Sequence, residues 1–209
     1  MEVLCSKYDV PHFIQRVLDK VHIKTVSQVS DVTNLPDDYV PDFVYFGGGH
    51  DVSPDLYGEN YHPKTVTHTN RDLLELFMFH KFKSNHRVKY FGICRGSQFL
   101  NVMSGGILTQ HLPDINAEHP YIHDAIIKNN SKLKNYIDGK KMLVNSTHHQ
   151  ASRFLGQNLI VTMTHRGIIE GFESIIADKI RAVQSHPEYF DIEYGNSLNI
   201  LQYLLRVEL

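Results

Sequence analysis

The clearest chemical feature of this chain is a cysteine that stands between two glycines at positions 92–96. A short apolar run, 88–93, predicts a buried strand before it, and apolar residues at helical spacing begin at Phe99. A nucleophile at the sharp turn between a strand and a helix is the layout of a nucleophile elbow. The amino end of a helix favours thiolate over thiol. We therefore predict that Cys94 is a nucleophile, although a lone cysteine is more often a small buried core residue.

A histidine and a glutamate near the carboxyl end of the chain could activate this cysteine. A cysteine nucleophile needs a base within hydrogen-bond reach, and the base needs an orienting group. In the segment 184–188, Pro187 fixes the backbone between His186 and Glu188. The carboxylate can then bind one imidazole nitrogen while the other takes the thiol proton. The alternative is a surface turn, because nothing local brings His186 to a cysteine 92 residues earlier in the chain.

Three glycines follow a strong strand candidate, 42–46, and open the segment 47–54. Glycine lets backbone N–H groups approach a site closely. Attack on an amide carbonyl creates an oxyanion that needs two such donors, one from this loop and one from the amide of Arg95. A phosphate-binding loop is disfavoured because the Lys-Ser/Thr ending and the G-x-G-x-x-G spacing are missing. A plain turn is the remaining alternative.

Two adjacent histidines lie in the polar segment 144–150. Neighbouring residues of a strand point to opposite faces, so His148 and His149 cannot simply chelate one metal ion together. The chain also lacks the H-E-x-x-H and C-x-x-C patterns of metal sites. We therefore expect no metal site, and we predict that His148, His149 and Gln150 line a substrate site.

Length and composition favour one domain over residues 1–209. Lysine plus arginine number 21 and aspartate plus glutamate number 23, so the net charge is 21 − 23 = −2. This balance gives no general attraction to nucleic acid or to anionic membranes. Cys5 and Cys94 are too few for a disulfide framework and fit a reducing cytosol. Because neither a signal peptide nor a membrane-spanning stretch is evident, we expect a cytoplasmic protein.

Strands alternate with helices in the first half of the chain. We expect strands at 3–5, 22–29, 42–46, 88–93 and 182–184, and helices at 10–21, 70–82, from Phe99 onward and at 197–207. Two of these helices should bury apolar stripes, made of Leu73, Leu74, Phe77 and Met78 in one and of Leu198, Leu201, Leu204 and Leu205 in the other. Alternating segments predict antiparallel strands at 123–128, 141–145, 159–164 and 167–172. This order predicts an α/β fold with a mostly parallel sheet covered on both faces.

Six segments, in this order along the chain, resemble the motifs of the class I glutamine amidotransferase-like family. Within it they are most similar to the γ-glutamyl hydrolases of the γ-glutamyl-γ-aminobutyrate hydrolase type. The matching residues are 48–59, Arg71 and Asp72 with Glu75, 92–102, 105–112, 145–151 and 184–188. The resemblance implies a flavodoxin-like three-layer α/β sandwich, with a mostly parallel central sheet and an additional small antiparallel portion.

The resemblance also implies a site and a reaction. Cys94 would be the nucleophile, His186 the general base and acid, and Glu188 its orienting group. Gly49 and Arg95 would donate to the oxyanion. The substrate-binding residues would be Gly48, Gln98, His148, His149 and Gln150. The expected reaction is hydrolysis of a γ-glutamyl amide through a thioester, with no metal or organic cofactor.

Two departures from the family pattern bear on substrate choice. The family usually has proline where this chain has Gly47, and the chain is short before the glycine loop. A glutaminase subunit that supplies ammonia to a separate synthetase partner is the alternative enzymatic interpretation. A catalytically idle binding or regulatory protein is a third interpretation, although no member of the implied Cys-His-Glu set is missing.

Overall fold

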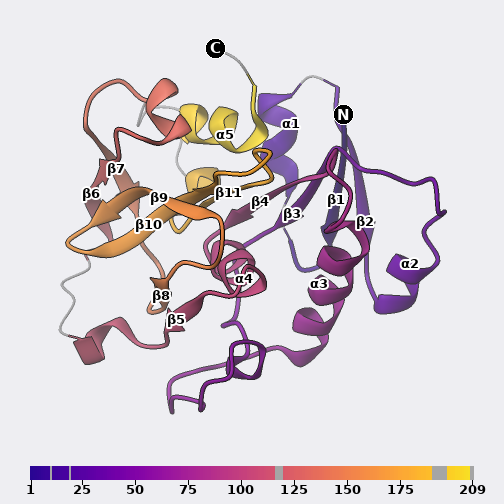
Figure 1. Ribbon diagram of the computed structural model, residues 1–209, viewed down its shortest axis with the longest axis horizontal. Coiled ribbons are helices and arrows are strands. Elements are labelled where there is room, and N and C mark those ends of the chain that lie inside the picture. The colour runs from indigo at the N-terminus through magenta and orange to yellow at the C-terminus, as the bar shows by residue number, and fades with distance from the viewer. Residues whose placement is uncertain (10, 19, 116–119, 190–196, 208–209) are drawn as a thin grey trace.

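The computed structural model describes the chain except residues 10, 19, 116–119, 190–196 and 208–209. One nine-stranded sheet runs through these described residues, in the order β2-β1-β3-β4-β11-β10-β9-β6-β7 (Figure 1). Its parallel part consists of β2 (His22–Val26), β1 (Glu2–Ser6), β3 (Phe43–Phe46), β4 (Lys89–Ile93) and β11 (Ile180–Val183). Its antiparallel part consists of β10 (Ile168–Ser174), β9 (Leu159–His165), β6 (Ile122–Ile127) and β7 (Lys141–Asn145).

Helices cover both faces of the sheet because the strand residues alternate between two cores. In β3, Phe43 and Tyr45 pack in one core and Val44 and Phe46 in the other. The first core is covered by α1 (Ile14–Val17) and α5 (Ser197–Leu205). The second is covered by α2 (Val29–Thr33), α3 (Thr69–Phe82) and α4 (Arg95–Met103). The described residues therefore form the three layers that the sequence predicts.

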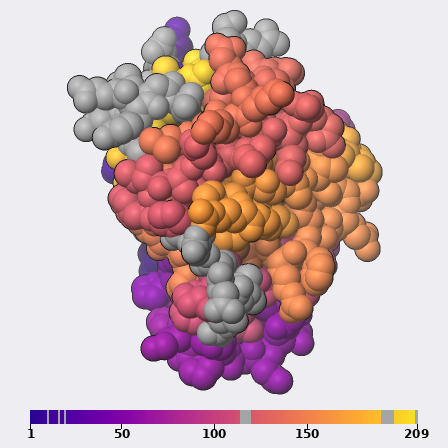
Figure 2. All heavy atoms as spheres, turned by 90° about the vertical axis from the view of Figure 1, so that its left-hand side faces the viewer, coloured from indigo at the N-terminus to yellow at the C-terminus, as the bar shows by residue number. Residues whose placement is uncertain are grey.

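The antiparallel strands occupy one end of the molecule. Figure 2 looks at this end, where residues of the second half cover most of the surface above the purple segments of the first half. A separate two-stranded sheet is formed by β5 (Ile107–Thr109) and β8 (Ala151–Phe154), which lie below β9 and β10 in Figure 1. This pair was not predicted from the sequence. The short helices are η1 (Pro11–Phe13), η2 (Pro54–Leu56), η3 (Leu112–Ile115), η4 (Lys132–Asn135) and η5 (Pro187–Tyr189).

Near the amino end, two predicted elements are shorter than expected. The helix expected at 10–21 is reduced to η1 and α1, because the chain is already extended at Leu18 (φ −124°, ψ 117°). Residues 10 and 19 of that prediction lie outside the described residues. The strand expected at 22–29 ends at Val26, since Gln28 and Asp31 form a capping box that starts α2.

The two predicted apolar stripes are half right in α3 and nearly right in α5. Leu74 and Met78 are buried, but Leu73 and Phe77 are 46% and 39% exposed. The buried face of α3 instead includes Arg71, Asp72 and Glu75, whose charges are paired with one another and with α4. In α5, Leu198 is 42% exposed, whereas the other three leucines are buried. No helix in the described part of the chain is long and apolar enough to cross a bilayer.

Candidate active site

Cys94 sits at the bend between β4 and α4. Its backbone has φ 52° and ψ −110°, a region that non-glycine residues rarely adopt and that stores strain at functional sites. The strand and the first turn of α4 pass so closely that a Cβ at Gly92 would stand 2.6 Å from the Gly96 carbonyl group. A Cβ at Gly96 would collide with the carbonyl of Phe46. The two glycines flanking Cys94 are therefore required by packing, as the sequence pattern indicates.

The sheet brings His186 to Cys94 across the 92 residues that separate them in the chain. Strands β4 and β11 pair in parallel with Ile93 opposite Val183, and the Cys94 amide donates to the Val183 carbonyl at 2.9 Å. Both strands therefore release their next residues at the same edge. The Asn145 side chain binds the His186 backbone from both sides, accepting from its N–H at 2.7 Å and donating to its carbonyl at 2.9 Å.

The His186 imidazole lies between Glu188 and Cys94. Its Nδ1 is 2.7 Å from Glu188 Oε1, and Cys94 is the other side chain whose interactions raise the pKa of the ring. Burial alone lowers the pKa of His186, but hydrogen bonds and charge interactions with Cys94 and Glu188 outweigh it and raise this pKa to about 10. Gln184 adds a hydrogen bond from its Nε2 to Cys94 Sγ at 3.6 Å. The imidazolium form is therefore favoured beside the sulfur.

The glycine loop passes between His186 and Arg71. A Cβ at Gly48 would be 2.6 Å from His186 Cε1, and a Cβ at Gly49 would collide with Arg71 Nη1. Gly49 also has φ +148°, which L side chains rarely adopt. Only glycine fits at both positions, so the loop backbone lies directly against the imidazole.

A buried network of charges holds the far side of this loop. Arg71 donates from Nη1 to the Gly48 carbonyl at 2.8 Å, and from Nη2 to the Gly47 carbonyl at 3.1 Å and to Asp9 at 2.9 Å. Its Nε donates to Glu75 at 2.6 Å. Burial and the nearby Glu75 charge raise the pKa of Asp9 to about 6, against the opposing effect of Arg71.

The same network reaches α4, the helix that follows Cys94. The Arg95 guanidinium is buried, and it forms ion pairs with Glu75 and Asp72. Glu75 thus binds Arg71 with one carboxylate oxygen and Arg95 with the other. Arg71, Asp72 and Glu75 belong to the matching family motifs, but no role was predicted for them. Asp9 was not predicted at all. The one available signal for Asp9 is its place just after β1, at the carboxyl edge of the parallel strands.

Comparison with known proteins decides the family. A sequence profile described as peptidase C26 matches residues 21–188, which is most of the chain. The chain belongs to the peptidase C26 family. This confirms the predicted relationship to glutamine amidotransferase-like and γ-glutamyl hydrolase proteins.

Individual relatives of this C26 chain agree with that assignment. It is 36% identical over 162 residues to protein NtpR of Enterococcus hirae, covering 70% of this chain and 66% of NtpR, just under two thirds of that relative. It is 29% identical over 173 residues to γ-glutamyl-γ-aminobutyrate hydrolase PuuD of Escherichia coli K12, covering 75% of this chain and 67% of PuuD. Its fold matches a solved glutamine amidotransferase from Thermotoga maritima with a TM-score of 0.64 at 15% identity, covering 99% and 95% of the two chains. The predicted fold is confirmed.

Of the five residues predicted to bind substrate, Gly48 lies against His186, the Gln150 side chain is buried, and the other three differ in direction. Gln98 and His148 turn toward the protein: Gln98 Nε2 donates to the Gln150 carbonyl at 3.0 Å, and His148 Nδ1 lies 2.8 Å from the same carbonyl oxygen. His149 instead lines a cavity of about 360 Å³ together with Gly49. His149 Nε2 also lies 3.2 Å from Asp51 Oδ2 in that cavity. Gly49, the predicted oxyanion donor, and His149 therefore share this cavity.

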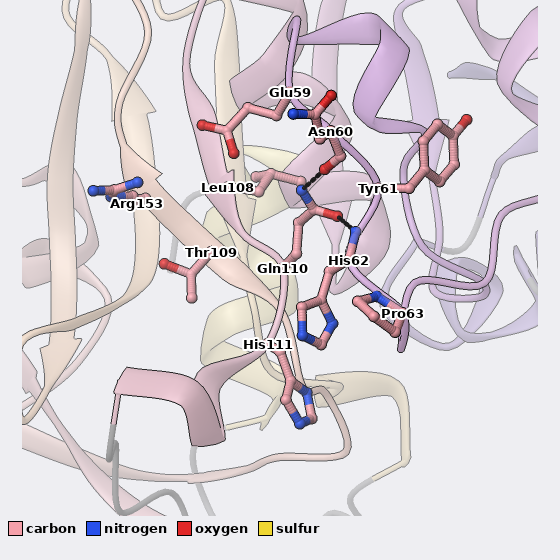
Figure 3. Close-up of a pocket in the computed structure, with 10 residues that line it drawn as sticks. All are labelled: Glu59, Asn60, Tyr61, His62, Pro63, Leu108, Thr109, Gln110, His111 and Arg153. Carbon is pink, nitrogen blue, oxygen red and sulfur yellow. Dashed lines mark hydrogen bonds between the residues drawn. The ribbon is translucent and has the colours of Figure 1, made fainter.

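A second, larger pocket of about 540 Å³ adjoins this cavity, because its His111 lies 3.2 Å from His149 between the two Nδ1 atoms. Gln110 fixes its wall, accepting from the His62 amide at 2.9 Å and donating to the Asn60 carbonyl at 2.8 Å (Figure 3). Glu59 and Arg153 also line it. Within the described ranges, no three His, Cys, Asp or Glu side chains are arranged to hold a metal ion. We call the pocket of about 540 Å³ the outer pocket.

Proposed function

We propose that this protein hydrolyses a γ-glutamyl amide bond, with Cys94 as nucleophile. The thiolate attacks the γ-carbonyl carbon and forms a carbon–sulfur bond, the carbonyl oxygen becomes an oxyanion, and the carbon–nitrogen bond breaks as the carbonyl re-forms. His186 gives its proton to the departing amine. Water then attacks the thioester, His186 takes a proton from that water, and the sulfur leaves as thiolate. The products are glutamate and the free amine.

The observation that carries this proposal is that the paired strands β4 and β11 end at the same edge and bring Cys94, at the strained elbow, beside the Glu188-bound His186. An imidazolium beside the sulfur favours thiolate, and its proton is available for a leaving amine. The carboxylate of Glu188 orients the ring. Each of the three groups therefore has the partner that acyl transfer through cysteine requires.

The oxyanion is assigned to the backbone amides of Gly49 and Arg95. Arg95 follows the nucleophile at the first position of α4, where its N–H has no partner within the helix. The Gly49 amide lies on the loop that touches His186. Two preorganised donors of this kind contribute about 10²–10³-fold each to acyl transfer.

Family membership supports a hydrolase of glutamine amidotransferase type, and the similarity to PuuD favours a γ-glutamyl substrate. The test is a panel of γ-glutamyl amides, glutamine included, assayed for glutamate release by the wild type, Cys94→Ala and Cys5→Ala. Release should vanish in Cys94→Ala and persist in Cys5→Ala. Cys5 is a matched control because burial raises the pKa of its thiol to about 12.

The outcomes of this panel separate the alternatives. Turnover of glutamine alone, slow until a synthetase partner is added, would indicate a glutaminase subunit. No turnover of any compound, together with no labelling of Cys94 by a thiol-reactive γ-glutamyl analogue, would indicate a binding or regulatory protein. Glutamate release that persists in Cys94→Ala would contradict the mechanism itself.

A further inference from the structure

We propose that Arg71 and Glu75 are positioning residues that aim both oxyanion donors, the amides of Gly49 and Arg95, at the reacting carbonyl. Neither side chain touches the substrate in this account. The proposal rests on the proposed function, since it explains how that site is preorganised. It is carried by the hydrogen bonds on the side of the glycine loop that faces away from His186.

The orientation of the Gly49 amide follows from the planarity of the peptide unit. The peptide bonds of this loop are trans, so the C=O and N–H of each unit point in opposite directions. Arg71 Nη1 holds the Gly48 carbonyl at 2.8 Å, and the N–H of the same unit, which belongs to Gly49, points away from Arg71. The Gly47 carbonyl is held by Arg71 Nη2 in the same way, which turns the Gly48 N–H to that side too.

The side opposite Arg71 is the side of the imidazole. The space where a Cβ of Gly49 would be is filled by Arg71, and the space where a Cβ of Gly48 would be is filled by His186. The loop is therefore clamped between the guanidinium and the imidazole. Because Arg71 takes both carbonyls, the loop presents consecutive N–H groups to the site, an arrangement that binds anions.

The second donor is tied to the same group. The Arg95 N–H belongs to the residue whose guanidinium is anchored on α3 by Glu75 and Asp72. Glu75 is fully buried and bridges Arg71 and Arg95, so it fixes the glycine loop and the first turn of α4 relative to each other. The two donors come from segments more than 40 residues apart, and a single carboxylate connects their anchors.

Stability alone gives no reason for this network. Its members are three acids and two arginines, Asp9, Asp72, Glu75, Arg71 and Arg95, and all of them are buried. Desolvation of buried ion pairs offsets most of their attraction, and well-packed apolar residues often serve as well. Their forked, directional hydrogen bonds do what apolar side chains cannot, which is to fix the direction of a peptide group.

The experiment compares two reactions of Cys94, only one of which forms an oxyanion. Acylation is followed as p-nitroaniline release from γ-glutamyl-p-nitroanilide, and alkylation as the rate of Cys94 modification by iodoacetamide. Arg71→Lys keeps the charge but cannot hold two carbonyls and two carboxylates at once. Glu75→Gln places an amide N–H against one guanidinium and breaks one link. Both variants should lose about 10²–10³-fold in kcat, the usual effect of an oxyanion donor. KM and the alkylation rate should stay near the wild-type values.

The matched control is Arg181→Lys, because Arg181 is also buried and bound to a carboxylate and a backbone carbonyl, but away from the loop. Arg181→Lys should keep the wild-type kcat even where it lowers thermal stability as much as Arg71→Lys or Glu75→Gln does. Equal slowing of acylation and alkylation in Arg71→Lys and Glu75→Gln would mean a merely structural role and would overturn the proposal. Wild-type acylation in both variants would overturn it as well. If the wild type releases no amine from any γ-glutamyl amide, the proposed function fails first and this inference fails with it.

Discussion

The surroundings of Cys94 and the outer pocket are neighbouring regions that differ in how far their polar groups are buried and paired. Around Cys94 the polar groups are buried, and most of them make two or more hydrogen bonds within the protein, as Arg71 and Glu75 do. In the outer pocket Tyr61 is 50% exposed, and Glu59 and Arg153 make no ion pair with any described residue. Fixed groups suit a step that is the same for every substrate, whereas exposed groups suit selection among leaving amines. The two regions should therefore respond differently to substitution.

The largest difference is expected when the nucleophile itself is removed. Cys94→Ala should lower glutamate release by roughly 10⁴-fold or more, because no other group can form the thioester. Steady-state assays with the best γ-glutamyl amide measure this. Cys5→Ala should stay within about twofold of the wild type, since a single buried methyl-sized change mainly affects stability.

Loss of the orienting carboxylate should be the next largest effect. Glu188→Gln keeps the shape but cannot stabilise the imidazolium, and kcat should fall by roughly 10²–10⁴-fold. The variant should still bind substrate with nearly the wild-type KM. A KM change with an unchanged kcat would show that Glu188 acts in binding and not in orienting His186.

The pH dependence of activity tests whether Glu188 raises the pKa of His186. In the proposed mechanism protonated His186 releases the amine, and its pKa is raised from 6.5 to about 10, so activity should persist above neutral pH and fall only as the pH nears that value. The stabilisation from its charge is complete below pH 6.5 and is lost as the pH rises through about 10. Because Glu188 is one cause of the rise, Glu188→Gln should move the alkaline limb of kcat/KM to lower pH. An unmoved limb would contradict this.

The smallest effects are expected in the outer pocket. Arg153→Gln and Glu59→Gln should leave kcat unchanged and shift KM by about fivefold or less, because the charges of the exposed Arg153 and the half-buried Glu59 are open to solvent and contribute at most about 1 kcal/mol. The shift should differ between leaving amines that carry a charge and those that do not. A loss of kcat in either variant would erase the distinction between the two regions.

Sequence reasoning worked where a pattern is local. The apolar runs of β3 and β4 and the Cys94 elbow are each read from a few adjacent residues, and the order of the motifs added the family. The roles of the site residues are still predictions, but the structure does bring Cys94, His186 and Glu188 together.

Features whose partners are distant in the chain could not be predicted from the sequence. The buried face of α3 could not be read from periodicity, because the partners of its charges include distant residues: Arg71 pairs with Asp9, 62 positions away, and Glu75 pairs with Arg95, 20 positions away. Leu73 and Phe77 were placed inside for the same reason: their apolar character was visible and the charge pairing opposite them was not. The pair β5 and β8 likewise joins short segments that carry no strong pattern alone.

The position of β11 between β4 and β10 has a consequence for synthesis of the chain. Residues 1–154 already contain the elbow strand, its helix and the glycine loop, whereas His186 follows β11, a strand that is synthesised later and enters the middle of the sheet. A growing polypeptide that has not yet reached position 186 has no base to take the thiol proton. The proposed base therefore reaches Cys94 only after β11 has been inserted between β4 and β10.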